Sequence, residues 1–262
     1  MTHTPTRLIA ATATRRGTRT YNCDAGEIYR LPGTGIVAAA IVDGIGNNPS
    51  VARFSRNAAY AIARTAARRT PLLGILAAAG MATAPPGARA GEDGVAAVAV
   101  AHPGRSTVIA WTGDSRVYSL PTDGDRLIQR STDQTMGEWM RNWGDNQFSI
   151  DLVTFRPEDG PARTMPMAEA AVLLDDVPRS TLAHCSMDTV LMLMVSDPLV
   201  VITSDGVHTQ LPHGELERLA REYADRPQKL ADAIVAAVLA DPVTGYRDDA
   251  TAIVIANPRE QN

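Results

Sequence analysis

Residues 35–46, GIVAAAIVDGIG, carry the strongest structural signal in the chain. The run from Gly35 to Val42 is small or β-branched and apolar, with no polar alternation, which is typical of a short buried strand. Asp43 ends the run, where a sheet meets solvent. Gly44 has no Cβ, so the backbone can turn close to whatever Asp43 holds. The stretch therefore predicts a buried strand that presents a carboxylate at the edge of a sheet.

Three further strand-like runs have an aspartate at one end. They are residues 108–113 before Asp114, residues 199–204 before Asp205, and residues 250–255 after Asp248 and Asp249. A single such aspartate is only a turn signal, but four similar runs indicate one shared site. Carboxylates that gather in this way repel one another unless protons or cations neutralise them.

The residue types near these strand ends favour a hard cation. No two of the five histidines have the spacing of a metal site, and only His208 lies beside a strand end. The two cysteines, Cys23 and Cys185, are far apart in the sequence. Carboxylate, carbonyl and water oxygens suit Mg²⁺ or Mn²⁺ better than Zn²⁺. Two such ions held about 3.5–4 Å apart activate a bridging water for attack on phosphorus.

Composition restricts the class of protein. The chain has 262 residues, of which 45% are apolar and 21% charged, with a net charge of −4. That charge argues against general binding to nucleic acid. No signal peptide is apparent, and the longest apolar stretch, residues 71–84, is shorter than the roughly 20 residues that span a bilayer. Two cysteines make no disulfide framework. We expect a cytoplasmic monomer that contacts neither membrane nor nucleic acid.

Periodicity indicates how the chain is organised. Apolar residues at helical spacing predict a helix over 51–69, and Asn47-Asn48-Pro49-Ser50 supplies its capping residues. Further helices are expected over 71–83, 135–143, 215–224 and 227–240. Residues 95–102, 106–111, 117–120 and 126–129 predict an antiparallel meander. Residues 1–14 fit an edge strand or a loose terminus, and residues 144–196 show no clear pattern. Strand runs followed by paired helices favour packed sheets covered by helices.

Five motifs in register resemble those of the metal-dependent PPM/PP2C protein phosphatases. They are Gly17-x-Arg19-x-x-Asn22-Cys23-Asp24, Val42-Asp43-Gly44-Ile45-Gly46, Thr112-Gly113-Asp114-Ser115-Arg116, Thr203-Ser204-Asp205-Gly206-Val207 and Asp248-Asp249-Ala250-Thr251. The resemblance runs from about residue 6 to residue 257. It implies an α+β fold, a four-layer αββα sandwich of two mainly antiparallel sheets, as a single domain over 1–262. Residues 1–5 and 258–262 would be loose termini, and 144–196 a variable flap region.

The resemblance also implies a dinuclear Mn²⁺ or Mg²⁺ site with two or three ions per chain. Asp43 would bridge two metals, the Gly44 carbonyl would bind the first, and Asp205 and Asp248 the second. Asp114 with Asp205 would hold a weaker third ion, and Asp24 would lie beside the site. Arg19 matches the phosphate-binding arginine, whose planar fork fits two phosphate oxygens. We therefore name Arg19, Asp43 and Asp205 as catalytic residues, and Asp24, Asp43, Gly44, Asp114, Asp205 and Asp248 as metal ligands.

Five positions depart from the family pattern. Cys23 replaces a Glu or Gln that bonds metal-bound water, which predicts weaker binding of the second metal and a buried, unreactive thiol. Ile45 stands where some members have a histidine acid, so the leaving-group proton would come from water. Asn47-Asn48 replaces Gly-His and affects entry into the helix. Asp249 replaces a common Asn.

These features predict a phosphoprotein phosphatase that hydrolyses phosphoserine and phosphothreonine with metal-activated water. Two alternatives stay open at this point. The first is an inactive pseudophosphatase that serves as a binding module, which the departures at Cys23 and Asn47-Asn48 favour. The second is a phosphatase of a small phosphorylated metabolite.

Overall fold

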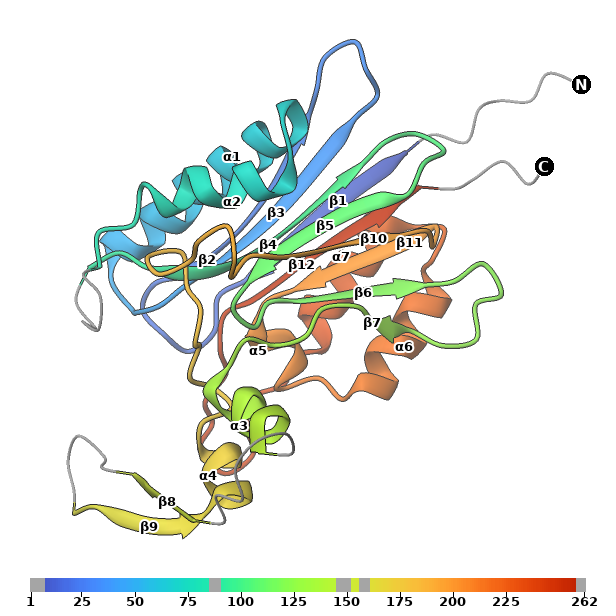
Figure 1. Ribbon diagram of the computed structural model, residues 1–262. Helices are drawn as coiled ribbons and strands as arrows, with labels where there is room; N and C mark the ends of the chain where they lie inside the picture. Colours follow the sequence, from blue (N-terminus) through green and yellow to red (C-terminus); the bar gives the residue numbers. More distant parts are fainter. Residues whose placement is uncertain (1–7, 85–90, 145–151, 156–160, 258–262) are drawn as a thin grey trace, which may run out of the picture.

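Two five-stranded sheets stack face to face and form the centre of the protein (Figure 1). The computed structural model describes residues 8–84, 91–144, 152–155 and 161–257. The expected loose termini, 1–5 and 258–262, lie outside these ranges. All strand pairs of the described chain are antiparallel.

The strand order places chain segments that are far apart in sequence next to one another. One sheet runs, in spatial order, β1 (Ile9–Arg15), β12 (Ala250–Ala256), β11 (Leu199–Thr203), β6 (Arg116–Leu120) and β7 (Ile128–Gln129). The other runs β10 (Leu191–Val195), β5 (Thr107–Thr112), β4 (Gly94–Ala101), β3 (Val37–Gly44) and β2 (Asp24–Arg30). Both faces of β3 and β4 are buried, which explains why their sequences are uniformly apolar.

Helices α1 (Pro49–Arg68) and α2 (Pro71–Ala79) cover the sheet that contains β3. Asn48 is the N-cap of α1, because its side-chain oxygen accepts from the backbone N–H groups of Ser50 and Val51, each at 3.0 Å. Thr70 caps α2 in the same way, accepting from the N–H of Leu73 at 3.2 Å. The apolar stripe of α1, which includes the buried Ile62, packs against the sheet.

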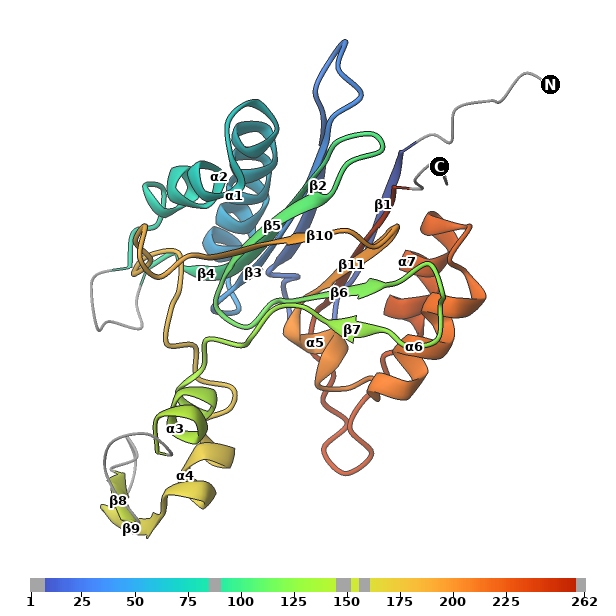
Figure 2. The ribbon, with the colours of Figure 1, turned by 45° about the vertical axis from the view of Figure 1, so that its right-hand side comes forward.

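Helices α5 (Asp205–His208), α6 (His213–Glu222) and α7 (Pro227–Ala237) lie on the opposite side (Figure 2). Leu216, Leu230 and Ile234 pack against the outer face of the other sheet. A third apolar cluster, which includes Ile41 and Ile253, fills the space between the sheets. The layers are therefore helix, sheet, sheet and helix, which confirms the predicted α+β sandwich.

A small substructure projects from the sandwich, away from the end where the chain termini lie (Figures 1 and 2). It contains α3 (Met136–Gly144), the hairpin of β8 (Leu152–Phe155) with β9 (Arg163–Pro166), and α4 (Met167–Leu173). Arg141 of α3 donates to Glu138 at 3.1 Å and to Asp175 after α4 at 3.0 Å. The first pair lies within α3, and the second joins α3 to the segment that follows α4.

One sequence-based expectation needs correction, and some strands were not expected. The meander over 95–129 is wrong as one sheet, because β5 belongs to one sheet and β6 to the other, and the chain changes sheets at Gly113. Gly113 has φ of +91° there, a conformation that favours glycine. Strands β2 and β10 were not expected. Within the described residues, no helix is long and apolar enough to cross a membrane.

Candidate active site

The predicted aspartates gather at one end of the sandwich. Asp43, near the end of β3, lies opposite Asp24, the first residue of β2. Asp205 lies two residues after the end of β11, and Asp248 lies just before β12. Asp114 lies in the connection between β5 and β6, where the chain passes from one sheet to the other. Strand ends from both sheets therefore bring these carboxylates together.

Asp43 and Asp205 form the centre of the cluster. Their carboxyl groups lie within hydrogen-bonding reach of each other, and both also interact electrostatically with Asp248. Burial raises the pKa of Asp43 well above its usual range, and the neighbouring Asp24 adds to the effect. Burial likewise raises the pKa of Asp205, reinforced by Asp43. Both groups therefore favour neutralisation, by a proton or by a bound cation.

Asp24 and Asp114 flank this centre and are themselves buried. Burial raises the pKa of Asp24 to about 7, against a 2.6 Å hydrogen bond that Ser204 Oγ donates to its Oδ2. That bond joins the two sheets, since Ser204 follows β11 and Asp24 begins β2. Burial also raises the pKa of Asp114 to about 7, with Asp205 as the next contribution. Both carboxyls thus share the electrostatic environment of Asp43 and Asp205.

The donor atoms suit a hard divalent ion. Asp43 Oδ2 is buried and, within the described chain, has no hydrogen-bond partner, which is the state of an oxygen that can ligate a cation. No three His, Cys, Asp or Glu side chains in the described ranges converge into a ready-made metal-binding group. The cluster therefore supplies ligand atoms of the right chemistry for such an ion.

Gly44 keeps the backbone close to this cluster. A Cβ at this position would collide with the Ser55 side chain and would lie 2.7 Å from the carbonyl oxygen of Cys23. The Gly44 N–H donates to the same carbonyl at 3.1 Å. The close approach of α1 and the β1–β2 loop therefore explains the glycine after Asp43.

Arg19 extends from the β1–β2 loop to the carboxylates. Its Nη2 donates to Asp248 Oδ2 at 3.1 Å, and its Nε donates to the Tyr246 hydroxyl at 2.9 Å. Burial of the guanidinium lowers its pKa, but Asp248 and Tyr246 outweigh this effect and the pKa of Arg19 is raised. The arginine therefore stays charged beside Asp43 and Asp248.

Asp249 holds the loop that carries Arg19. It is buried, its Oδ1 accepts from the Gly17 N–H and its Oδ2 accepts from the Cys23 N–H, both at 2.8 Å. A Cβ on Gly17 would collide with the carbonyl oxygen of Arg247, so the two segments lie in direct backbone contact. We call this arrangement the Asp249 clamp. It fixes both ends of residues 17–23.

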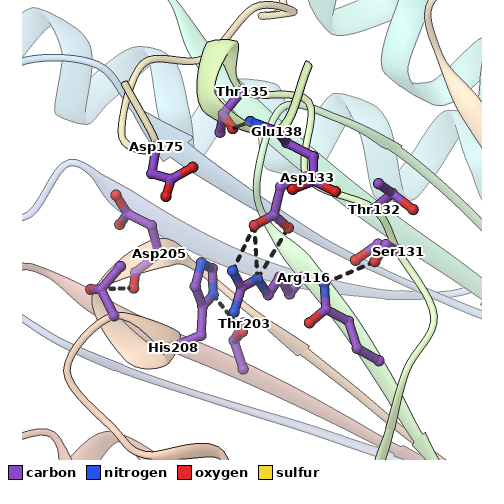
Figure 3. A network of polar contacts seen from close by, with 12 residues as sticks. Arg116, Ser131, Thr132, Asp133, Thr135, Glu138, Asp175, Thr203, Asp205 and His208 are labelled. Carbon is purple, nitrogen blue, oxygen red and sulfur yellow. Dashed lines mark hydrogen bonds and ion pairs between the residues drawn. The ribbon is translucent and has the colours of Figure 1, made fainter. Parts of the chain in front are cut away.

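A cavity of about 570 Å³ adjoins the cluster on the side of the projection. Asp114 and Asp205 line it, and Asp133, Glu138 and Asp175 share the lining with Asp205 (Figure 3). The side chains that line it are those of Asp114, Arg116, Gln129, Ser131, Thr132, Asp133, Glu138, Arg141, Asp175, Asp176, Asp205, His208 and Thr209. The cavity therefore gives a ligand room between the carboxylates and α3.

An arginine and a histidine on this wall have fixed partners. Arg116 is paired with Asp133, to which its Nη2 donates at 2.6 Å (Figure 3). His208 Nδ1 lies 3.3 Å from Thr203 Oγ1. Burial lowers the pKa of His208 well below its usual value, and the charge of Arg116 adds to the effect. A neutral imidazole therefore lies in the wall next to Asp205.

The positions that depart from the family pattern have defined places. Cys23 is buried, its Sγ lies 3.9 Å from the carbonyl oxygen of Asn48, and burial raises its pKa. That environment fits the expected unreactive thiol. Asn47 Oδ1 accepts from the Tyr21 N–H at 3.1 Å, while Asn48 caps α1. Asn47 and Asn48 therefore hold the loop beside the site and start the helix.

The sequence interpretation missed three contributors to the site. Ser204 was quoted only as part of a motif, and its bond to Asp24 across the sheets was not foreseen. Asp249 was noted as a replacement, without its two backbone bonds. Tyr246 was not considered. The only available signal was that Ser204 and Tyr246 lie close in sequence to the predicted ligands Asp205 and Asp248. Their hydrogen-bond partners come from distant segments, which a local pattern does not identify.

Comparison with known proteins gives a likeness in structure only. No family model and no curated protein matches the sequence. The serine/threonine phosphatase of S. agalactiae superimposes with a TM-score of 0.71 at 12% identity, covering 96% of this chain and 100% of that one. The Mycobacterium tuberculosis serine/threonine phosphatase PstP/Ppp gives 0.61 at 19% identity, covering 97% and 99%.

A third similar structure is a complex with cacodylate. It is the PPM Ser-Thr phosphatase MsPP from Mycobacterium smegmatis in complex with cacodylate, with a TM-score of 0.66 at 18% identity, covering 95% of this chain and 98% of that chain. At such identities the likeness concerns the arrangement of elements, which agrees over nearly the whole length. The chain therefore has the fold of the bacterial PPM-type Ser/Thr phosphatases.

Proposed function

We propose that the chain is a metal-dependent phosphoprotein phosphatase that hydrolyses phosphoserine and phosphothreonine. The observation that carries the proposal is the cluster of Asp43, Asp205 and Asp248 with Arg19 beside it, at the end of a PPM-type sandwich. This arrangement suits a phosphate monoester, because its oxygens would be attracted both by the Arg19 guanidinium and by cations that the carboxylates hold.

The carboxylate ligands would come from different strand ends. Asp43 would bridge two Mn²⁺ or Mg²⁺ ions, with the Gly44 carbonyl on one and Asp205 and Asp248 on the other. Asp114 with Asp205 would hold a weaker third ion, and Asp24 would support the site from beside Asp43 and Asp205. The bound ions would lower the pKa of water and offset the charge that develops on phosphorus.

The protein's own groups would bind and orient the ester. Arg19 would hold two phosphate oxygens with its planar fork, so that the phosphorus faces the carboxylate cluster. The Asp249 clamp would keep the Arg19 loop in place. Ile45 cannot protonate the leaving oxygen, so that proton would come from solvent water.

Hydrolysis of p-nitrophenyl phosphate and of phosphoserine and phosphothreonine peptides, with and without Mn²⁺, tests the proposal. We expect Mn²⁺-dependent turnover that falls at least about 1,000-fold in Asp43→Asn and in Asp205→Asn, since each removes a ligand charge. Asp232→Asn, on the exposed side of α7, is the matched control. Near-normal rates in both site variants would refute the site assignment.

The same assays separate the two alternatives. Tight Mn²⁺ binding with no turnover of any phosphorylated compound would identify a binding module. Turnover of small phosphorylated metabolites without turnover of phosphopeptides would identify a metabolite phosphatase.

A further inference from the structure

Tyr246 contacts Arg19 in two ways. Its hydroxyl accepts from Arg19 Nε at 2.9 Å, and the Arg19 Cζ atom lies 5.8 Å from the centroid of its ring. A guanidinium has five N–H donors. In the described chain, Arg19 uses one on Tyr246 and one on Asp248. Three donors, including both on Nη1, thus stay available for a ligand.

The loop that presents Tyr246 is closed by its own hydrogen bonds. Asp241 Oδ1 accepts from the N–H groups of Val243 and Thr244 at 3.0 and 2.7 Å, and the Asp241 N–H donates to the Tyr246 carbonyl at 2.8 Å. Gly245 has φ of +70°, which lets the chain turn back to Tyr246. The backbone of Tyr246 is therefore fixed by contacts that involve none of the clustered carboxylates.

Asp248 and Tyr246 hold Arg19 in different ways. Asp248 attracts the guanidinium by charge, but in the proposed function its carboxylate also ligates a cation, and that cation would weaken its attraction for Arg19. The Tyr246 hydroxyl is neutral and is not needed as a ligand, although it also hydrogen-bonds the Asp248 side chain. Its bond to Nε is on the side of the guanidinium away from Nη1. Tyr246 can therefore hold Arg19 while the Nη1 and Nη2 edge binds an oxyanion.

We propose that Tyr246 is the positioning residue of Arg19 and sets the affinity of the site for a phosphate oxyanion. The inference rests on the proposed function, since it takes Arg19 as the phosphate-binding group. It adds a residue that acts through Arg19, without a role for Tyr246 in the chemical step.

The chain contains a matched pair away from the site. Arg68 Nη2 donates to the Tyr29 hydroxyl at 2.8 Å, and the Arg68 Cζ atom lies 5.7 Å from the Tyr29 ring centroid. This pair joins the end of α1 to β2 and involves none of the clustered aspartates. Tyr29→Phe therefore removes the same kind of hydrogen bond without touching the site.

The first test observes Arg19 directly, in metal-free protein. In a ¹⁵N NMR spectrum, the Arg19 Nε–H signal is assigned by its loss in Arg19→Lys. We expect Tyr246→Phe to shift this signal and to speed its exchange with solvent, and Tyr29→Phe to leave it unchanged. An Arg19 signal with the same shift and exchange rate in Tyr246→Phe as in wild type would overturn the proposal.

The second test measures inorganic phosphate binding by calorimetry in the presence of Mn²⁺. We expect Tyr246→Phe to weaken binding about fivefold, which corresponds to one net hydrogen bond of about 1 kcal/mol. For a substrate with measurable turnover, KM should rise by a similar factor, while kcat changes less than twofold. Tyr29→Phe should match wild type. Equal phosphate affinity in Tyr246→Phe and wild type, or no phosphate binding to wild type, would overturn the proposal.

The two proposals can fail separately. Absence of turnover in wild type would refute the proposed phosphatase function, while the Arg19 signal and the phosphate affinity would still decide the role of Tyr246. Turnover in wild type with identical Arg19 signals in both Tyr→Phe variants would refute the role of Tyr246 alone.

Discussion

Asp43 and Asp249 lie at the same end of the sandwich, and their carboxyl groups have opposite kinds of partner. Each oxygen of Asp249 accepts a backbone N–H at 2.8 Å. Asp43 Oδ2 is buried with no hydrogen-bond partner in the described ranges, and the Asp43 carboxyl interacts with those of Asp24 and Asp205. Burial alone therefore does not distinguish a structural carboxylate from a ligand. The hydrogen-bond partners of each carboxylate oxygen distinguish the two roles.

The difference has a physical consequence. A carboxylate that accepts two N–H groups stabilises the folded chain, because its charge replaces lost hydration with two charge-assisted bonds. A carboxylate that faces another carboxylate destabilises the fold until a proton or cation joins them. The comparison indicates that Asp249 stabilises the folded chain. Asp43 lowers the unfolding free energy of the metal-free protein and supplies an oxygen that can bind a cation.

The largest expected effect is on stability and differs in sign between the two residues. Asp249→Ala should lower the free energy of unfolding by about 3 kcal/mol, since it leaves the Gly17 and Cys23 N–H groups without acceptors. Asp43→Asn should raise it in metal-free protein, because it removes a charge from the cluster. Urea unfolding at pH 7.5 with a chelator measures both.

Asp249→Asn is the conservative control, because it keeps one acceptor oxygen and should lose about half as much. Equal destabilisation by Asp43→Asn and Asp249→Asn would show that the two carboxylates do not differ as described.

The next effect concerns the ion itself. Mn²⁺ at about 100 times its dissociation constant should raise the unfolding free energy of wild type by about 2.7 kcal/mol, if it binds only the folded state. Asp43→Asn should lose most of this gain, while Asp232→Asn should keep it. Thermal unfolding across a Mn²⁺ titration measures the gain. A full gain in Asp43→Asn would place the ion elsewhere.

Much of this arrangement could be predicted from residues near one another in sequence. The uniform apolar run that ends in Asp43 identifies a central strand, because both of its faces are buried. The capping residues before Val51 correctly start α1, as Asn48 shows. The prediction that distant aspartates converge followed from their shared place at strand ends, and both sheets do bring them together.

The parts that were missed depend on contacts between distant segments. β2, with its Gly26 and charged Glu27, has no clear strand pattern and becomes a strand by pairing with β3. The apolar run of β10 is an edge strand whose pairing with β5 no local pattern specifies. The role of Asp249 arises from a loop more than 220 residues earlier in the chain. Periodicity carries no information on such pairings.

The smallest expected effect concerns His208, which lies in the cavity wall near Asp205. The pKa of His208 is well below its usual value, mainly because of burial and then because of Arg116. In the unfolded chain the His208 imidazole is protonated near pH 6.5, whereas in the folded chain it is protonated only at a lower pH. Stability from His208 is thus present above pH 6.5 and is lost as the pH falls towards the folded-state pKa.

Each pH unit in that window should cost the wild type at most about 1.4 kcal/mol through this group. His208→Asn should remove that part of the slope in urea unfolding between pH 6.5 and 5. His102→Asn, at the opposite end of β4, should keep the wild-type slope. Identical slopes in wild type and His208→Asn would mean that the ring takes up its proton in the folded state, and that the wall beside Asp205 is wetter than its contacts imply. Such a wall would also solvate Asp205, which would weaken the contrast between the carboxylate cluster and the Asp249 clamp.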